Sequence, residues 1–317
     1  MTLHSEHSVT VAAAPEVLFG LIGDVTLWPA IFEPTVHAKH LRRAPGEERF
    51  QLWALARGEL KTWVSRRSLD PGRRYITFEQ ERTQAPIASM SGSWTFHPSG
   101  GGTVVVLAHD FTAVGNGEHD EWLVSAVDVN SNRELAALRR IAELGHAVTD
   151  VVVSFEDEMR LQGSADDAYS FIDRSDLWPQ RLRHVARVSL LEPQPGVQYM
   201  EMDTMTSDGS THTTRSIRLC FPPGQIVYKQ LVTPELLLGH SGSWQLTRRD
   251  GGDVATARHT VVINPDAVPR VLGADRTLAD AQAFVRDALG ANSRATMSRA
   301  SEYAGQLAAS GRNGAVP

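Results

Sequence analysis

A repeat near 150 residues constrains this chain more than any other feature of its sequence. Two motifs occur in both copies: Leu-Trp-Pro at residues 27–29 and 177–179, and Ser-Gly-Ser-Trp at residues 91–94 and 241–244. A histidine stands 15 residues after the tryptophan of each Ser-Gly-Ser-Trp motif, as His109 and His259. Because this period is too long for a solenoid, the sequence predicts tandem domains of one fold, over residues 1–147 and 148–310.

Each copy shows the same order of secondary-structure signals. An alternating or apolar stretch typical of a strand opens the copies at residues 8–11 and 151–155. A short helix, several strands separated by Gly- and Pro-rich turns, and a long helix at about 118–144 or 277–307 follow. This order predicts an α+β fold in which a curved antiparallel sheet wraps around the long C-terminal helix. One helix cannot fill the concave face of such a sheet, so we expect an interior cleft.

Composition and charge exclude several classes of protein. The net charge of −6 divides into −4 for residues 1–150 and −2 for residues 151–317, so neither half offers the basic surface that nucleic acids need. No apolar run approaches the roughly 18 residues of a membrane-spanning helix. With one cysteine, Cys220, and no export signal, the sequence predicts a cytoplasmic protein. Its histidines form no metal-binding pair on a predicted helix, so no metal site is expected.

Three segments of the first copy resemble a known family. They are Asp-Val-Thr-Leu-Trp-Pro-Ala-Ile-Phe at residues 24–32, Thr-Trp-Val-Ser-Arg-Arg at 62–67, and Trp-Thr-Phe at 94–96 with Gly-Gly-Thr at 101–103. These segments are similar to the bacterial aromatic polyketide aromatase/cyclases, which belong to the START-like (Bet v 1-like) helix-grip superfamily. Both copies show the likeness, which implies the two-domain subclass.

The predicted strand around residue 65 carries the first candidate catalytic residues. Ser65 and Arg67 are two residues apart, so their side chains face the same side of the sheet. Arginine keeps its charge and suits the stabilisation of an enolate or alkoxide oxygen. The resemblance implies that role for Arg67 and, beside Ser216, for Arg218. Without the resemblance, the pattern favours an outward arginine paired with a surface carboxylate.

His109 and His259 are the expected proton carriers, because histidine titrates closest to neutral pH. Each lies on the strand after a glycine-rich turn and faces the concave side of its sheet if Trp94 does. Single-domain relatives often have glutamine at this position. The alternative for a lone strand histidine is a hydrogen bond to the backbone or to solvent. Paired carboxylates do not stand out, since the acidic residues at 118–121 resemble the first turn of a helix.

Aromatic and soft apolar side chains are expected to line the clefts and to shape an elongated, planar substrate. Packing in the core is the alternative for each of them. The set comprises Trp28, Phe32, Trp63, Met90 and Trp94 in the first copy, and Trp178 and Trp244 in the second. Family relatives can carry a pocket tyrosine just after Phe32, where this chain has Thr35, so Thr35 is the local candidate for a polar contact with the substrate. The first copy is the more aromatic, because Thr214 and Leu182 replace Trp63 and Phe32 in the second.

The resemblance implies an aromatase/cyclase of type II polyketide biosynthesis. Such an enzyme directs an intramolecular aldol closure of the first ring of a poly-β-ketone tethered to an acyl carrier protein, and promotes dehydration to the aromatic product. No cofactor is expected, because aldol condensation and loss of water include no redox step. The competing hypothesis is a non-catalytic tandem carrier or sensor of a hydrophobic small molecule, since START-like clefts serve both roles.

Overall fold

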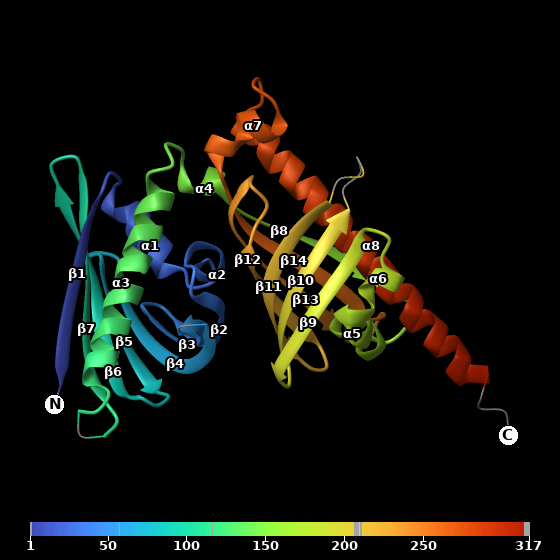
Figure 1. Cartoon of the computed structure of the whole chain (residues 1–317), viewed down its shortest axis with the longest axis horizontal. Coiled ribbons are helices and arrows are strands. Elements are labelled where there is room, and N and C mark those ends of the chain that lie inside the picture. Colours follow the sequence, from blue (N-terminus) through green and yellow to red (C-terminus); the bar gives the residue numbers. More distant parts are fainter. Residues whose placement is uncertain (1, 57, 116, 206–208, 210, 314–317) are drawn as a thin grey trace. The chain divides into compact units, whose positions relative to one another are not determined.

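The computed structural model divides into two compact units, at residues 1–148 and 149–317 (Figure 1). It describes residues 2–56, 58–115, 117–205, 209 and 211–313. Each unit contains one seven-stranded antiparallel sheet and one long helix. The predicted α+β class with two tandem helix-grip folds is confirmed. None of the helices in the described ranges combines the length and the hydropathy needed to cross a membrane.

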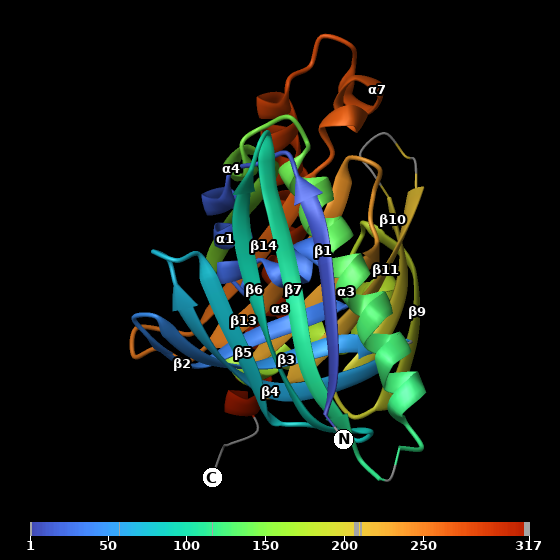
Figure 2. The same ribbon diagram turned by 90° about the vertical axis from the view of Figure 1, so that its left-hand side faces the viewer.

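The first unit is a meander of strands closed by its first strand. In chain order it contains β1 (Leu3–Val11), α1 (Pro15–Gly23), α2 (Trp28–Ile31), β2 (Thr35–Ala44), β3 (Glu47–Ala56), β4 (Glu59–Asp70), β5 (Tyr75–Arg82), β6 (Ile87–Ser99), β7 (Gly102–Ala113) and α3 (Asp120–Ala142). Across the sheet the strands run β1-β7-β6-β5-β4-β3-β2. Helix α3 packs along β1 and β7, as Figure 2 shows. The sheet therefore covers one helix, which leaves part of its concave face free for a site.

The second unit repeats this topology with a longer final helix. It contains α4 (Val148–Val151), β8 (Val152–Arg160), α5 (Ala165–Asp173), η1 (Ser175–Leu177), α6 (Trp178–Arg181), β9 (Val185–Gln194), β10 (Val197–Met205), β11 (Thr211–Phe221), β12 (Gln225–Val232), β13 (Leu237–Thr247), β14 (Val254–Ile263), η2 (Pro265–Ala267), α7 (Val268–Leu272) and α8 (Leu278–Asn313). Its strand order is β8-β14-β13-β12-β11-β10-β9. Helix α8 has 36 residues against 23 in α3, and it extends past the predicted end near residue 307.

Strand alternation decides which side chains face the concave side of the first sheet. In β4, Ser65 and Arg67 are buried, whereas their neighbours Arg66 and Ser68 are exposed. The same alternation buries Trp94 on β6 and Leu107 on β7. Successive strand residues point to opposite faces, so the spacing accounts for the shared face of Ser65 and Arg67. Burial of both shows that this face is the inward one, as the resemblance implied and against the outward alternative.

The glycine of the repeated Ser-Gly-Ser-Trp motif has a packing reason. A Cβ atom on Gly92 would lie 2.1 Å from the carbonyl oxygen of Ala108 and 2.5 Å from the ring of Phe78 on the paired strand. In the second unit, a Cβ on Gly242 would lie 2.4 Å from the hydroxyl of Tyr228. Glycine at this position lets an aromatic ring of the neighbouring strand cross the sheet surface.

Candidate active site

A cavity of about 200 Å³ lies inside the first unit, between strands β3 to β7 and helix α3. The sequence analysis assigned six side chains to the cleft of this copy, and four of them line the cavity: Trp28, Trp63, Met90 and Trp94. The candidate catalytic residues Ser65, Arg67 and His109 line it as well. One cavity thus brings together an aromatic wall and the polar groups that the sequence singled out.

Phe32 and Thr35 lie outside the lining of this cavity, contrary to the expectation from sequence. Phe32 is 1% exposed and packs edge-on against Trp28, with 5.6 Å between the ring centroids. Thr35 is buried at the start of β2, and its backbone N–H donates to the carbonyl of Phe32 at 3.2 Å. Both residues are therefore packed in the core, which was the alternative hypothesis for the cleft residues. Trp28, which contacts Phe32, lines the cavity instead.

Arg67 points inward, but its donors are already engaged. Its Nε donates to Oε1 of Glu48 at 2.8 Å, and Nη2 also donates to that oxygen. Nη1 donates to the carbonyl of Ile22 at 2.8 Å, and Nη2 to the carbonyl of Gly23 at 2.7 Å. The guanidinium also lies over the ring of Trp28, 5.0 Å from its centroid. Burial lowers the pKa of Arg67, against the opposing effect of Glu48.

These contacts limit what Arg67 can offer a substrate. The guanidinium has five N–H donors, and four are used by Glu48, Ile22 and Gly23, which leaves one N–H of Nη1. It is not the outward surface arginine of the alternative hypothesis, and its expected contact with an oxyanion stays a prediction. Arg67 joins the end of α1 to strands β3 and β4, and it holds Trp28 at the cavity wall. We assign it a positioning role, while Ser65 Oγ donates to the backbone carbonyl of Glu79 at 3.2 Å.

His109 is the candidate whose chemistry is least constrained by its neighbours. It lines the cavity from β7 and meets the ring of Phe78 edge-on, with 5.3 Å between the ring centroids. Its Nδ1 is buried and has no hydrogen-bond partner. Burial lowers the pKa of His109 to about 4, so the imidazole is neutral at pH 7. A neutral imidazole with a free nitrogen facing an apolar cavity can accept a proton.

Glu134 reaches the same cavity from the helix side. It lies on α3 and is half-buried, and it forms no hydrogen bond or ion pair with the described residues. Removal from water raises the pKa of Glu134 to about 7, because nothing nearby stabilises the carboxylate. At neutral pH a substantial fraction of this side chain is therefore a carboxylic acid, which can donate a proton. Among the described residues, no group of His, Cys, Asp or Glu could hold a metal ion.

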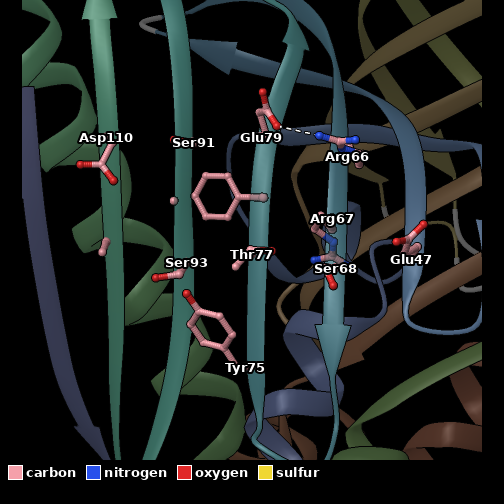
Figure 3. A pocket seen from close by; sticks show the side chains of 13 residues that line it. Glu47, Arg66, Arg67, Ser68, Tyr75, Thr77, Glu79, Ser91, Ser93 and Asp110 are labelled. Carbon is pink, nitrogen blue, oxygen red and sulfur yellow. Dashed lines mark hydrogen bonds and ion pairs between the residues drawn. The ribbon is translucent and has the colours of Figure 1, made fainter. Parts of the chain in front are cut away.

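A second hollow, of about 440 Å³, lies over the opposite face of the same sheet (Figure 3). Its lining includes the hydroxyl side chains of Ser68, Thr77 and Ser93 and the exposed ion pair of Arg66 with Glu79, whose Nη2 and Oε2 are 2.9 Å apart. These five residues alternate with the inward ones, so their side chains cannot reach the interior cavity. His109 and Glu134 line the interior cavity and are absent from the lining of the second hollow.

In the second unit Arg218 lacks the carboxylate that accompanies Arg67. Gln198 occupies the position of Glu48, opposite Arg218 on the paired strand. Arg218 is 1% exposed and donates from Nη2 to the carbonyl of Ile172 at 2.7 Å, while its Nη1 has no hydrogen-bond partner among the described residues. Ser216 is buried beside it and its Oγ also has no partner. The repeated Ser-x-Arg pattern therefore produces two different electrostatic environments.

Trp178 and Trp244, assigned to the second cleft from sequence, lie in a hydrophobic core cluster. Both are under a tenth exposed, and the cluster includes Met200, Ile226 and Met297. These neighbours favour the alternative hypothesis, in which both tryptophans are packed in the core.

His259 is fixed in a buried network, unlike His109. Its Nδ1 lies 3.0 Å from the hydroxyl of Tyr228 and 3.1 Å from Nε2 of His240, and its Nε2 lies 2.7 Å from Oγ of Ser293 on α8. At the equivalent positions the first unit has Phe78 and Met90. Polar residues thus replace apolar ones around the second histidine, and their hydrogen bonds occupy both of its ring nitrogens.

This network predicts a pH-dependent stability for the second unit. Burial lowers the pKa of His240 to about 3 and of His259 to about 4, from 6.5. Between pH 6.5 and 4 the unfolded chain therefore binds more protons, and stability falls as the pH falls, by up to about 1.4 kcal/mol per pH unit for each histidine. In urea unfolding of the full chain, His240→Met is expected to remove about half of the pH dependence that His240 and His259 together contribute. Exposed His146→Met is the control, and an unchanged pH dependence in His240→Met contradicts the assignment.

Relatives of known name place the chain in a family. It is 51% identical over 310 residues to the granaticin polyketide synthase bifunctional cyclase/dehydratase of Streptomyces violaceoruber, covering 96% of this chain and 95% of that protein. It is 52% identical over 309 residues to the actinorhodin polyketide synthase bifunctional cyclase/dehydratase of Streptomyces coelicolor, covering 94% of this chain and 96% of that protein. The chain belongs to the polyketide cyclase/dehydratase family.

Two further comparisons agree with this family. The di-domain ARO/CYC BexL from the BE-7585A biosynthetic pathway is 44% identical, with a TM-score of 0.84, covering 95% of the cyclase/dehydratase chain described here and 98% of BexL. The family described as polyketide cyclase / dehydrase and lipid transport matches residues 2–143. Both domains of a solved di-domain structure therefore have counterparts in this cyclase/dehydratase.

Sequence reasoning missed two carboxylates of this cyclase/dehydratase. Glu134 stands seven residues after Val127 and four before Leu138, on the buried stripe of α3, where a charged residue is unexpected. Glu48 alternates with Phe50 on β3 and is 5% exposed. Each breaks an otherwise apolar pattern on a core-facing side, and that break was the available signal.

Proposed function

We propose that the cavity of the first unit directs the aldol closure of the first ring of a poly-β-ketone and its dehydration to an aromatic product, in a type II polyketide pathway. The observation that carries this proposal is the pairing of groups inside one cavity: a neutral His109 from the sheet, whose buried Nδ1 has no hydrogen-bond partner among the described residues, and a partly protonated Glu134 from the helix. Two groups whose surroundings move their pKa values in opposite directions suit a base and an acid at one pH.

The chemistry assigns one step to each group. His109 takes a proton from the acidic CH₂ between two carbonyls, and the enolate carbon bonds to a ketone carbon to close the ring. The resulting alkoxide takes this proton back from His109 and becomes an alcohol. His109 then removes a second proton from the ring carbon next to this alcohol, while Glu134 gives its proton to the departing hydroxyl, so water leaves and a double bond forms. The proton left on His109 returns to Glu134 through solvent and restores both groups. Protons and electrons balance without an oxidant or reductant.

The cavity wall contributes position rather than chemistry. Ring closure depends on holding two distant carbons of one flexible chain together, which can replace much of the entropic barrier. Trp28, Trp63 and Trp94 provide flat apolar surfaces for that fold. At about 200 Å³ the cavity is smaller than sites that enclose a whole ligand of drug size, which measure about 300–1,000 Å³. It therefore takes the ring-forming segment, while an acyl carrier protein holds the thioester end outside.

Replacing Glu134 with glutamine tests this proposal. Glutamine keeps the shape but cannot transfer a proton, so Glu134→Gln is expected to lower kcat for dehydration roughly 100-fold. The wild-type rate is expected to fall above pH about 7, where Glu134 loses its proton, and this fall should be absent in the variant. The measurement is the product profile and pH dependence in a reconstituted polyketide synthase.

Exposed Glu121→Gln, on the same helix, is the matched control and should retain wild-type rates. If Glu134→Gln keeps the wild-type product spectrum and pH profile, Glu134 is not the acid. If omission of the whole protein also leaves the spectrum unchanged, the non-catalytic carrier hypothesis replaces the enzyme.

A further inference from the structure

A groove of about 430 Å³ on the second unit collects three arginines. It is formed by α5, α6 with the turn that follows it, and α8, which lie beside one another in Figure 1. Arg181 and Arg183 come from the end of α6 and the turn, and Arg299 comes from α8. Glu302 is the one carboxylate in the lining. The groove therefore carries an excess of positive charge in a unit whose net charge is negative.

Two of these arginines make no direct ion pair with a described carboxylate, although Arg181 is close enough to Asp176 to help lower the pKa of that carboxyl group. Arg299 donates from Nη1 to Glu302 at 2.6 Å, which neutralises that pair. Neither Arg181 nor Arg183 forms an ion pair with the described residues, although Arg174 and Arg187 of the same unit do. Two guanidinium groups are therefore available for an anion supplied from outside the chain.

Arg181 is held in place by aromatic rings rather than by hydrogen bonds. Its guanidinium lies 4.9 Å from the ring centroid of Phe171 and 5.3 Å from that of Tyr303. Its Nη1 is buried and has no hydrogen-bond partner within the described ranges. Stacking fixes the plane of the guanidinium while leaving N–H donors unused. The buried Nη1 is closed to an outside carboxylate, so the donors on the exposed part of the half-buried guanidinium are the ones that can bind it, and the fixed plane limits the conformational entropy lost on binding.

The repeat shows that the fold does not require these charges. At the positions of Arg181 and Arg183 the first unit has Ile31 and Glu33. Ile31 is buried in the same short helix, so an apolar residue satisfies this position structurally. The arginines belong to the second copy alone, which points to a role outside folding.

We propose that this arginine groove is the docking surface for a carboxylate-bearing face of the acyl carrier protein, an inference that rests on the proposed function. The groove follows α8 from Arg299 to Gln306, which is roughly 10 Å along a helix. That length exceeds one small anion and suits several carboxylates on a partner helix or loop. Charge complementarity of this kind sets the rate and register of association. The second unit recruits the carrier, and the first unit performs the chemistry.

The test uses the full chain and a double variant that restores the residues of the first copy, Arg181→Ile with Arg183→Glu. The control, Arg248→Ile with Arg249→Glu, makes the same charge change at two exposed arginines outside the groove. Binding of the holo acyl carrier protein is measured by calorimetry at low salt. The Kd and the KM for carrier-bound substrate are expected to rise roughly tenfold in the groove variant alone. The kcat/KM for the same polyketide as a small, carrier-free thioester is expected to stay within about twofold.

Equal carrier affinity in the groove variant and the wild type overturns the docking proposal, as does an equal loss in the control. Binding of inorganic phosphate that depends on Arg181, without an effect on carrier affinity, makes the groove a small-anion site and also overturns it. If the wild-type chain converts neither substrate, the proposed function fails, and the calorimetric comparison still decides the docking surface. Circular dichroism of both double variants confirms that they fold.

Discussion

His109→Leu is expected to lower kcat for ring closure and dehydration roughly 100- to 10,000-fold, the range for loss of a positioned acid–base group. Leucine fills a similar volume against Phe78, so the cavity and the fold are retained. The imidazole of His109 is neutral above pH about 4. Its buried Nδ1 has no hydrogen-bond partner among the described residues and can accept a proton. The measurement is single-turnover formation of the aromatic product in the reconstituted system.

His97→Leu is the matched control for this substitution. His97 lies on the neighbouring strand β6, and its side chain is exposed and bonded to Thr95 at 3.0 Å, away from the cavity. The control is expected to keep the wild-type rate. A His109→Leu protein that forms aromatic product at the wild-type rate would remove His109 from the mechanism.

Glu48→Gln is expected to destabilise the first unit by about 3–5 kcal/mol, because it leaves the buried Arg67 without its counter-charge. Both side chains are at most 5% exposed, and their ion pair is one of the most buried contacts of the unit. The second unit tolerates glutamine at the equivalent Gln198, but there Asp173 and Glu192 act on Arg218. At those two positions the first unit has Gly23 and Arg42, which supply no negative charge.

Urea unfolding of the full chain, followed by tryptophan fluorescence, measures this loss. The first unit holds five of the seven tryptophans, so its transition dominates the signal. Exposed Glu47→Gln, one residue away, is the control and should change stability by less than about 0.5 kcal/mol. A Glu48→Gln protein as stable as the control contradicts a structural role for the ion pair and returns Arg67 to the list of groups free to bind substrate.

The two copies have diverged in ways that concern chemistry more than fold. Around the repeated histidine, Phe78 and Met90 of the first unit become Tyr228 and His240 in the second, and the second histidine is hydrogen-bonded on both ring nitrogens. The first unit keeps a free histidine in a cavity, and the second gains an arginine groove on its surface. This division gives a physical reason for carrying two domains of one fold.

Much of the first site was predictable from sequence because it depends on strand alternation. Spacing predicted that Ser65 and Arg67 share a face and that His109 faces the same side as Trp94, the resemblance favoured the concave side, and all four line the cavity. Phe32 and Thr35 were assigned to the same wall but lie outside it. Phe32 packs against Trp28, which lines the cavity, and spacing along the chain does not determine which of the two rings reaches it.

The sequence by itself determined the repeat, the tandem α+β domains and which strand residues share a face, because these follow from local periodicity and internal comparison. Only the tertiary structure decided which partners the inward residues meet. Arg67 contacts Glu48, 19 residues away, and Ile22, 45 residues away. His109 shares its cavity with Glu134 of a different element. Such pairings set charge and pKa, and they arise from contacts between segments whose separation no local pattern encodes.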